Sequence, residues 1–280
     1  MSAPIEIITD TSLTEKGFYW RESDGVKVLV CKPLEENGFT NGFSTRLGGV
    51  SPLPENSLNL SGFDFDTREN ITENRRRFLK TFNANYSLAT VWQIHSDLIK
   101  TATGENISES DEKFDAIISN IDKVLIGVKT ADCVPVLIGD PKTKSYAAIH
   151  AGWRGTVQSI AVKAIERLKN EFNSNPCDLI CAIGPAAVSN YEVGKDVIDE
   201  FNEKFPNSKH LFSPTRENHA YIDLHKANFE QLVSSGVSKN NIFVAPFCTM
   251  SRTDLFFSYR VDRKVFGKTG RLLSVIGKKY

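Results

Sequence analysis

The sequence has few cysteines and no long run of apolar residues. Its 280 residues include five cysteines, an odd and sparse count that argues against a disulfide network and favours a reducing compartment. No run approaches the ~20 apolar residues of a membrane helix. The N-terminus has neither the basic region nor the long apolar stretch of a signal peptide. We therefore expect a cytoplasmic protein that does not associate with membranes.

Neither sign of charge is in excess. Lys and Arg number 34, as do Asp and Glu, so no overall field favours nucleic acid. The one basic run, residues 75–77, falls in an expected helix beside Glu69 and Glu73, which indicates a solvated face. We expect no nucleic acid partner, and nothing in the sequence indicates a protein partner.

Strand-like and helical stretches follow one another in an irregular order. Helical spacing is clearest over 156–172, begins again near residue 70, and recurs near 194–204 and 225–235. Strand-like runs occur at 17–20, 26–30, 89–94, 123–129, 134–139, 145–150, 178–183, 242–246 and 272–276. Hairpins mixed with crossover helices predict an α+β fold. With no repeat and no linker, residues 1–280 are expected to form a single domain.

Two chemically reactive side chains stand at the ends of one expected hairpin. The segment 140–144 is a turn between two apolar runs, so the runs are expected to pair antiparallel. Such pairing returns Cys133 opposite His150 or its neighbour, where Cβ atoms lie about 4.5–5.5 Å apart. A slip of one residue would send the two side chains to opposite faces. The pattern predicts either a metal site or a Cys–His dyad.

His95 supplies a third candidate ligand, because it ends the strand-like run 89–94. Two imidazoles and a thiolate suit zinc, and three protein ligands leave a fourth position open for water or substrate. The alternative for each residue is structural: Cys133 as a small buried hydrophobe, and His95 and His150 as ordinary polar residues at strand ends.

The segment after His150 has the features of an anion site. Residues 152–156 lead into the expected helix 156–172, where free N–H groups and the helix dipole favour an anion. Gly155 allows a ligand to approach the backbone, and Arg154 offers a charge-assisted contact to phosphate. Arg46 lies in the irregular, glycine-rich segment 45–67, whose length suggests a functional loop. The alternative for both arginines is a solvated charge.

Several segments together resemble the signatures of one known family. The chain resembles the YfiH/LACC1 family, formerly labelled laccase-like multicopper polyphenol oxidases, which includes bacterial peptidoglycan-editing factors. The three principal matches are residues 93–95 (QIH), 131–135 (ADCVP) and 150–156 (HAGWRGT). Further matches are residues 42–51 (GFSTRLGGVS), 57–60 (SLNL), 73–76 (ENRR), 183–185 (IGP), 191–194 (YEVG) and 256–260 (FFSYR). The matches extend over nearly the whole chain.

The resemblance implies a fold, a cofactor and an activity. The fold would be a layered α/β/β/α sandwich with mixed sheets, and the cofactor a zinc on His95, Cys133 and His150. The activity would be phosphorolysis of purine nucleosides (adenosine, inosine, possibly methylthioadenosine) to base and ribose 1-phosphate, together with adenosine deamination. Zinc can polarise a substrate and lower the pKa of water, which suits both reactions. Cys133, His150 and Asp132 would be catalytic, and Arg46, Arg154 and Gly155 would bind substrate.

Other functions remain open from the sequence. One alternative is a metal-free hydrolase in which His150 activates the Cys133 thiolate, acting in peptidoglycan editing. Another is a structural zinc domain without turnover. Copper is possible at the same ligands, but five histidines in total are too few for the several centres of a multicopper oxidase.

Overall fold

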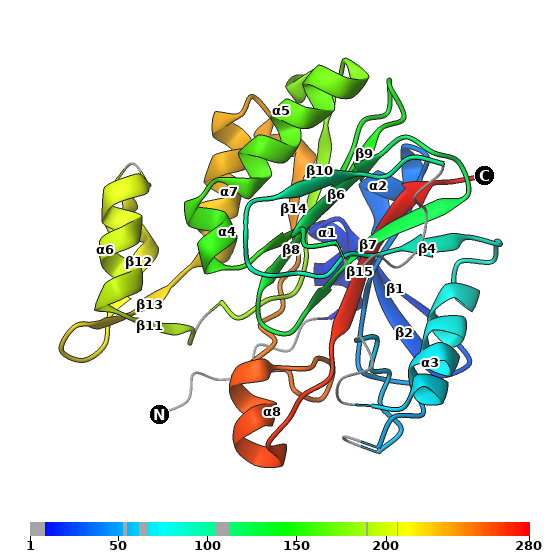
Figure 1. Cartoon of the computed structure of the whole chain (residues 1–280), viewed down its shortest axis with the longest axis horizontal. Coiled ribbons are helices and arrows are strands. Elements are labelled where there is room, and N and C mark those ends of the chain that lie inside the picture. Colours follow the sequence, from blue (N-terminus) through cyan, green and yellow to red (C-terminus); the bar gives the residue numbers. More distant parts are fainter. Residues whose placement is uncertain (1–8, 53–54, 62–65, 105–111, 189, 206) are drawn as a thin grey trace.

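The chain folds into a layered sandwich with helices on both outer faces (Figure 1). The computed structural model describes residues 9–52, 55–61, 66–104, 112–188, 190–205 and 207–280. Parts of the predicted 45–67 loop, at 53–54 and 62–65, lie outside these ranges. The fold is a single-domain α+β structure with mixed sheets, which confirms the predicted fold class.

Two large sheets form the inner layers. The first has the order β1-β2-β3-β15-β7-β4 and consists of β1 (Phe18–Ser23), β2 (Val26–Cys31), β3 (Phe39–Ser44), β15 (Leu272–Lys278), β7 (Val124–Thr130) and β4 (Ser87–Ala89). The second has the order β14-β10-β8-β9-β6-β5 and consists of β14 (Ile242–Val244), β10 (Ile180–Ile183), β8 (Val134–Gly139), β9 (Tyr146–Ala151), β6 (Ala116–Ser119) and β5 (Ile99–Thr101). Most neighbours are antiparallel, but β4 and β7, β5 and β6, and β10 and β14 run parallel.

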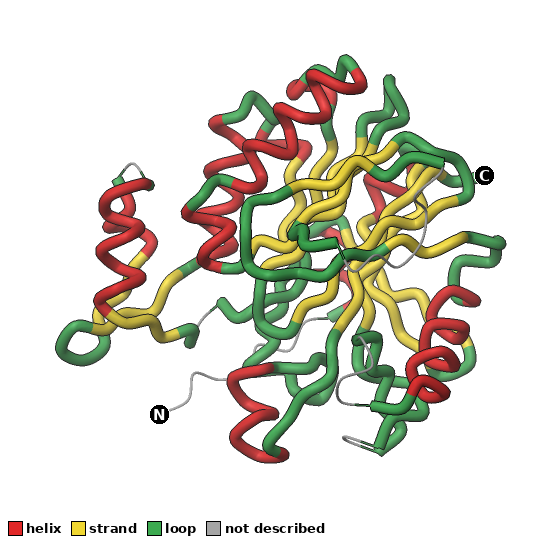
Figure 2. The backbone as a smooth tube through the Cα atoms, in the orientation of Figure 1, coloured by secondary structure: helices red, strands yellow, loops and turns green. Residues whose placement is uncertain are grey.

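Helices and a small third sheet complete the structure (Figure 2). The helices are α1 (Asp10–Glu15), α2 (Lys32–Glu36), α3 (Arg68–Lys80), α4 (Trp153–Val157), α5 (Ile160–Phe172), α6 (Lys195–Lys204), α7 (Leu224–Ser234) and α8 (Tyr259–Phe266). Short 3-10 turns occupy Pro176–Asp178, Ser208–Leu211 and Lys239–Asn241. The small sheet, β11 (Glu192–Gly194), β13 (His219–Ile222) and β12 (Phe212–Pro214), packs with α6 at the side of the sandwich. None of the described helices combines the length and apolarity that crossing a bilayer requires.

The core is divided among the layers by the alternation of side chains along each strand. In β8, Val136 and Ile138 face the cluster that contains Leu168 of α5, whereas Leu137 faces the other large sheet. Burial on both faces explains why this strand reads as one continuous apolar run. Phe78 of α3 packs on the outer face of the first sheet. The site described next lies at one end of the doubly covered sheet.

Most predicted elements are present, with shifted ends, but two predictions are wrong. The strand predicted at 89–94 is only Ser87–Ala89, and the following residues have no regular partner beyond one isolated bridge, between Trp92 and Lys113. Trp92 and Ile94 are 50% and 40% exposed, so their apolar character does not reflect burial in a strand.

The helix predicted over 156–172 begins at Ile160, because the chain breaks at Gln158 and Ser159. Ser159 takes a left-handed conformation with φ of 61°. The Thr156 carbonyl accepts from the Ser159 amide and from Gln231 of α7, so the freed backbone group is satisfied by a side chain. The preceding helix α4 has five residues. The long helix dipole on which the predicted anion site depended therefore does not start at residue 156.

Candidate metal centre

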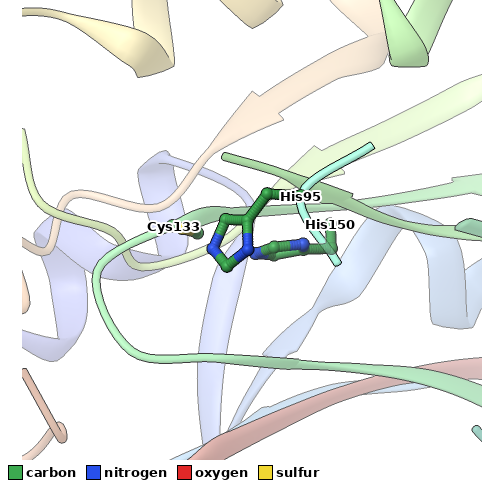
Figure 3. A group of neighbouring side chains, drawn as sticks. All are labelled: His95, Cys133 and His150. Atoms are coloured by element: carbon green, nitrogen blue, oxygen red, sulfur yellow. The ribbon is translucent and has the colours of Figure 1, made fainter. Parts of the chain in front are cut away.

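Three side chains from distant parts of the sequence converge at one end of the second sheet (Figure 3). His150 lies in β9, Cys133 directly precedes β8, and His95 belongs to the segment between β4 and β5. Their ligand atoms all lie within 4.8 Å of one another. The two imidazole rings are 4.9 Å apart and inclined at 76°. The structure thus brings together the three residues that the sequence predicted as metal ligands.

The donor set fits a single metal ion. The ligand atoms lie within 4.8 Å of one another, and donors around a tetrahedral zinc with bonds of about 2.0–2.3 Å lie about 3.3–3.8 Å apart, so the side chains would close around an ion by rotating toward it. His150 is 3% exposed and Cys133 is half-buried, whereas His95 is exposed. An ion held here would therefore have one side toward solvent, which is the arrangement of a site with an open position.

The hairpin register differs from the prediction. Pro135 lies directly opposite His150, and Val134 lies opposite Ala151, so Cys133 stands one position before the paired residues. The register is set at the turn, where Gly139 pairs with Tyr146 and the Asp140 amide donates to the Ser145 carbonyl. Asp132, with a left-handed φ of 83°, lies just before the paired residues of β8. Cys133 and His150 meet diagonally across the hairpin rather than face to face.

His95 is held by a turn, not by a strand. Its φ of 61° is left-handed, a conformation that needs support in a residue with a side chain. Three successive amides, those of Ile94, His95 and Ser96, point at the carboxylate of Asp115, with donor–acceptor distances of 3.2, 2.9 and 2.6 Å. These hydrogen bonds stabilise the turn that presents His95 to the site.

Asp115 is a residue of the site that the sequence did not reveal. It is fully buried, and its Oδ1 lies 2.7 Å from Nδ1 of His150. It directly precedes β6 and lies 20 residues from His95 and 35 from His150, so no local motif links it to either. The only sequence feature that could have identified it is a carboxylate beside an apolar strand.

The charges of the cluster support one another. Burial raises the pKa of Asp115, but hydrogen bonds from His150 and Ser96 outweigh burial and lower it to about 2. Burial also raises the pKa of the Cys133 thiol, but the charge and hydrogen bond of His150 outweigh it, so that pKa is lowered. A lowered thiol pKa favours the thiolate, which is the form that binds metals and attacks electrophiles.

Asp132 faces away from the hairpin and ties neighbouring loops together. Its Oδ1 accepts from the Thr249 hydroxyl and its Oδ2 from the Arg260 amide, each at 2.7 Å. Its carbonyl accepts from the Ala187 amide at 2.8 Å. The side chain is buried, and burial raises the pKa of its carboxyl. These contacts fix the loops around Cys133, and the proton-shuttle role of Asp132 stays a prediction.

The residues predicted to bind phosphate after His150 lie in different surroundings. Arg154 is exposed, and its guanidinium stacks 4.3 Å from the centre of the Trp153 ring. Gly155 is buried, and a Cβ there would lie 3.1 Å from the Ser96 carbonyl oxygen. Gly155 therefore allows α4 to pack closely on the turn that carries His95. Substrate binding by Arg154 and Gly155 stays a prediction.

Arg46 is buried rather than solvated. It is 6% exposed, donates to the Thr253 carbonyl at 2.7 Å, and lies 3.6 Å from the Asp262 carboxylate. Its guanidinium also stacks over the Phe257 ring at 4.7 Å. Within the described residues, its Nε and Nη2 have no hydrogen-bond partner. Through Asp262, Arg46 holds α8, the helix that carries Arg260 next to Asp132.

Two further arginines border the cluster. Arg260 stacks 4.6 Å from the centre of the Tyr191 ring, and the pKa of Tyr191 is raised by burial and by the charge of Cys133. Burial lowers the pKa of Arg271, while the negative charge of Cys133 acts in the opposite direction. Neither arginine forms an ion pair with a carboxylate in the described part of the chain. Arg260 and Arg271 therefore bring positive charge near Cys133, alongside the carboxylate of Asp132.

Comparison with known proteins assigns the family. The family model described as multi-copper polyphenol oxidoreductase laccase matches residues 40–279, and the chain belongs to this family. It is 31% identical to the purine nucleoside phosphorylase SACOL1200 of Staphylococcus aureus (strain COL) over 262 residues, covering 90% of this chain and 96% of that protein. A purine nucleoside phosphorylase of Staphylococcus epidermidis, SERP0752, is 31% identical over 246 residues, covering 85% of this chain and 91% of that protein.

Solved structures agree with this assignment. The hypothetical protein YfiH of Bacillus licheniformis has a TM-score of 0.84 at 29% identity, covering 93% of this chain and 99% of that chain. YlmD of Geobacillus stearothermophilus has a TM-score of 0.83 at 30% identity, covering 92% of this chain and 98% of that chain. The predicted resemblance to the YfiH family is therefore confirmed.

The name of the family implies several copper sites, but the described residues contain one candidate metal site. The three remaining histidines have other partners: His210 pairs with Glu230, His219 bonds the Glu217 carbonyl, and His225 bonds the Gly184 carbonyl. Within the described residues, His95, Cys133 and His150 are the one group that could hold a metal. The ligand set suits one mononuclear centre.

Proposed function

We propose that this protein is a zinc-dependent purine nucleoside phosphorylase that also deaminates adenosine. The observation that carries the proposal is the solvent-facing cluster of His95, Cys133 and His150, bordered by arginines, in a chain whose relatives are named purine nucleoside phosphorylases. Its substrates would be adenosine, inosine and, as a further candidate, methylthioadenosine, with phosphate as the second substrate. Copper is the alternative metal at these ligands. A reducing compartment such as the cytoplasm would preserve the Cys133 thiolate.

The chain's own residues would bind phosphate next to the metal ligands. Arg260 and Arg271 lack carboxylate partners in the described ranges, so each guanidinium is available to an anion. Arg154, which is exposed in α4, would add a third cation to the site. Arg46 would form the buried base of this phosphate site, because its Nε and Nη2 remain able to donate hydrogen bonds.

The remaining roles follow from position. Zinc, when bound, supplies a Lewis acid that stabilises negative charge as it develops on the substrate. Cys133 and His150 would hold the ion from the rigid hairpin, and His95 from the exposed turn. Asp132 would keep the loops around the nucleoside in place and, in our proposal, take part in proton transfer. Deamination needs water in place of phosphate, so the two reactions would share ligands and differ in their second reactant.

The test combines metal analysis with turnover. We expect one zinc per chain in purified protein, and phosphate-dependent cleavage of adenosine and inosine to free base and ribose 1-phosphate. Deamination of adenosine to inosine should proceed without phosphate. A chelator should stop both reactions, and added zinc should restore them.

Other outcomes would identify the alternatives. Release of free base and ribose without phosphate would mean a hydrolase. Activity that survives complete removal of metal would favour the Cys133–His150 nucleophile, including the peptidoglycan-editing alternative. Bound metal without turnover of any nucleoside would favour a structural site. Oxidation of phenols with stoichiometric copper would support the older family label.

A further inference from the structure

The carboxylate of Asp115 is held by hydrogen bonds from two separate parts of the chain. Three successive backbone amides donate to it, and the Ser96 hydroxyl donates to Oδ2 at 2.7 Å. Nδ1 of His150 adds a fifth contact at 2.7 Å to Oδ1. Converging backbone amides of this kind form a concave anion-binding nest. Here the anion is supplied by the protein itself.

The backbone of Asp115 is as firmly held as its side chain. Its amide donates to the Leu98 carbonyl at 2.9 Å, and its carbonyl accepts from the His150 amide at 2.8 Å. The residue therefore sits between the segment that carries His95 and the strand that carries His150. With both carboxylate oxygens occupied and the side chain fully buried, Asp115 has no free lone pair directed at solvent or substrate. Its contacts suit positioning rather than proton transfer.

We propose that Asp115 is the positioning residue of the metal centre and orients both histidine ligands at once. It acts on His150 through the ring, because accepting from Nδ1 keeps the proton there and leaves Nε2 to face Cys133 and the ion. It acts on His95 through the backbone, because the nest holds the left-handed turn at residue 95. The inference rests on the metal proposed above but not on the reaction.

The first test is the substitution Asp115→Asn measured by zinc affinity. An amide keeps one acceptor oxygen, but its NH2 group would meet the N–H donors of the nest or the ring of His150. Replacing residues that orient metal ligands typically costs about 10- to 100-fold in metal affinity. We expect a loss of that order for Zn²⁺, measured by competition with a chromogenic chelator and therefore independent of turnover.

Asp140→Asn is the matched control. Asp140 is also fully buried and also holds a turn, since it accepts from the amides of Lys142 and Thr143 and from the Thr143 hydroxyl. It stands at the opposite end of the β8–β9 hairpin from the cluster. We expect Asp140→Asn to lower the melting temperature while leaving the zinc affinity of the folded protein unchanged. Equal losses of affinity in the two variants would overturn the proposal.

The second test needs no variant and decides the matter if Asp115→Asn does not fold. In zinc-loaded wild-type protein, long-range ¹H–¹⁵N NMR of the imidazoles should show a proton on Nδ1 of His150 and the metal on Nε2. Metal on Nδ1 would overturn the inference, as would wild-type zinc affinity in a folded Asp115→Asn protein. Wild-type protein that binds no zinc at all would overturn both the proposed function and this role of Asp115, whereas zinc binding without nucleoside turnover would overturn the proposed function alone.

Discussion

Gly152 lies directly against the sulfur of Cys133. A Cβ at position 152 would be 3.1 Å from Sγ of Cys133 and 3.2 Å from Cδ2 of His95. The φ of Gly152 is −65°, so its backbone would accept any residue, and space alone requires glycine. Glycine at position 152 therefore leaves room for Cys133 and His95 to approach each other.

We therefore predict that Gly152→Ala weakens metal binding. The new methyl group has to displace Cys133 or His95, and either movement disturbs the ligand geometry. We expect zinc content after dialysis to fall well below one ion per chain while circular dichroism stays unchanged. Gly104→Ala is the control, since a Cβ there would meet nothing within 4 Å. Full zinc occupancy in Gly152→Ala would contradict the prediction.

Replacing any one ligand is expected to remove the metal. His95→Ala, Cys133→Ala and His150→Ala leave two donors each, too few for stable zinc binding. Turnover should be lost with the metal, while the sandwich core, to which these side chains contribute little, should stay folded. Cys177→Ala, at an exposed free cysteine, should keep both metal and activity. Metal analysis by mass spectrometry, paired with thermal unfolding, measures both properties.

Phosphorolysis is expected to depend on the arginines more than deamination does. Arg260→Gln and Arg271→Gln remove cations beside Cys133, so the KM for phosphate should rise while deamination of adenosine changes less. Because ionic contacts to phosphate weaken with salt, the wild-type KM for phosphate should also rise with ionic strength.

Arg154→Gln tests the exposed arginine of α4. If Arg154 binds phosphate, its loss should depress phosphorolysis more than deamination. An unchanged KM for phosphate would leave Arg154 as a surface cation stacked on Trp153. Equal losses of both reactions in every arginine variant would instead mean that these side chains hold the fold or the nucleoside.

Asn74 is expected to stabilise the loop that precedes α3. Its Nδ2 donates to the Ser51 hydroxyl and the Asn59 carbonyl, and its Oδ1 accepts from the Val50 amide. Asn74→Ala would leave such buried groups unsatisfied, at about 1–3 kcal/mol each. We expect denaturant unfolding to show a loss of that order, and little change in Asn240→Ala, whose residue is exposed. Stability equal to the wild type would show that the loop is held by other contacts.

The sequence predicted the ligands better than it predicted their surroundings. The hairpin pattern around residues 140–144 was sufficient to bring Cys133 near His150, because alternating turn and apolar residues specify pairing. It did not give the register, since turn-forming residues at 140–144 mark where the chain reverses but not which flanking residues pair across it. His95 was a candidate ligand from its residue type and its place after an apolar run, and the resemblance then joined it to the other two, which spacing alone could not do.

Elements that depend on tertiary contacts were missed or misplaced. The break at Ser159 is stabilised by a hydrogen bond from Gln231, which is 72 residues away. The apolar residues on either side of the break keep helical spacing, so the sequence contains no sign of it. Trp92 and Ile94 look like strand residues but are exposed beside the site. Asp115 acts through contacts with residues 20 to 35 positions distant, and local sequence patterns do not record such contacts.

The fold holds two of the three ligands more rigidly than the third, and this difference affects how a metal ion would be exchanged. Cys133 and His150 belong to a hairpin inside a sheet covered on both faces, whereas His95 stands on an exposed turn with no strand partner. Opening of that turn breaks its hydrogen bonds to Asp115 but leaves the sandwich packed, so it requires less free energy than global unfolding. The ion would therefore enter and leave when His95 moves away from the site, and the rate at which this turn opens would set the residence time of the metal. A chelator could then remove the ion while the protein stays folded.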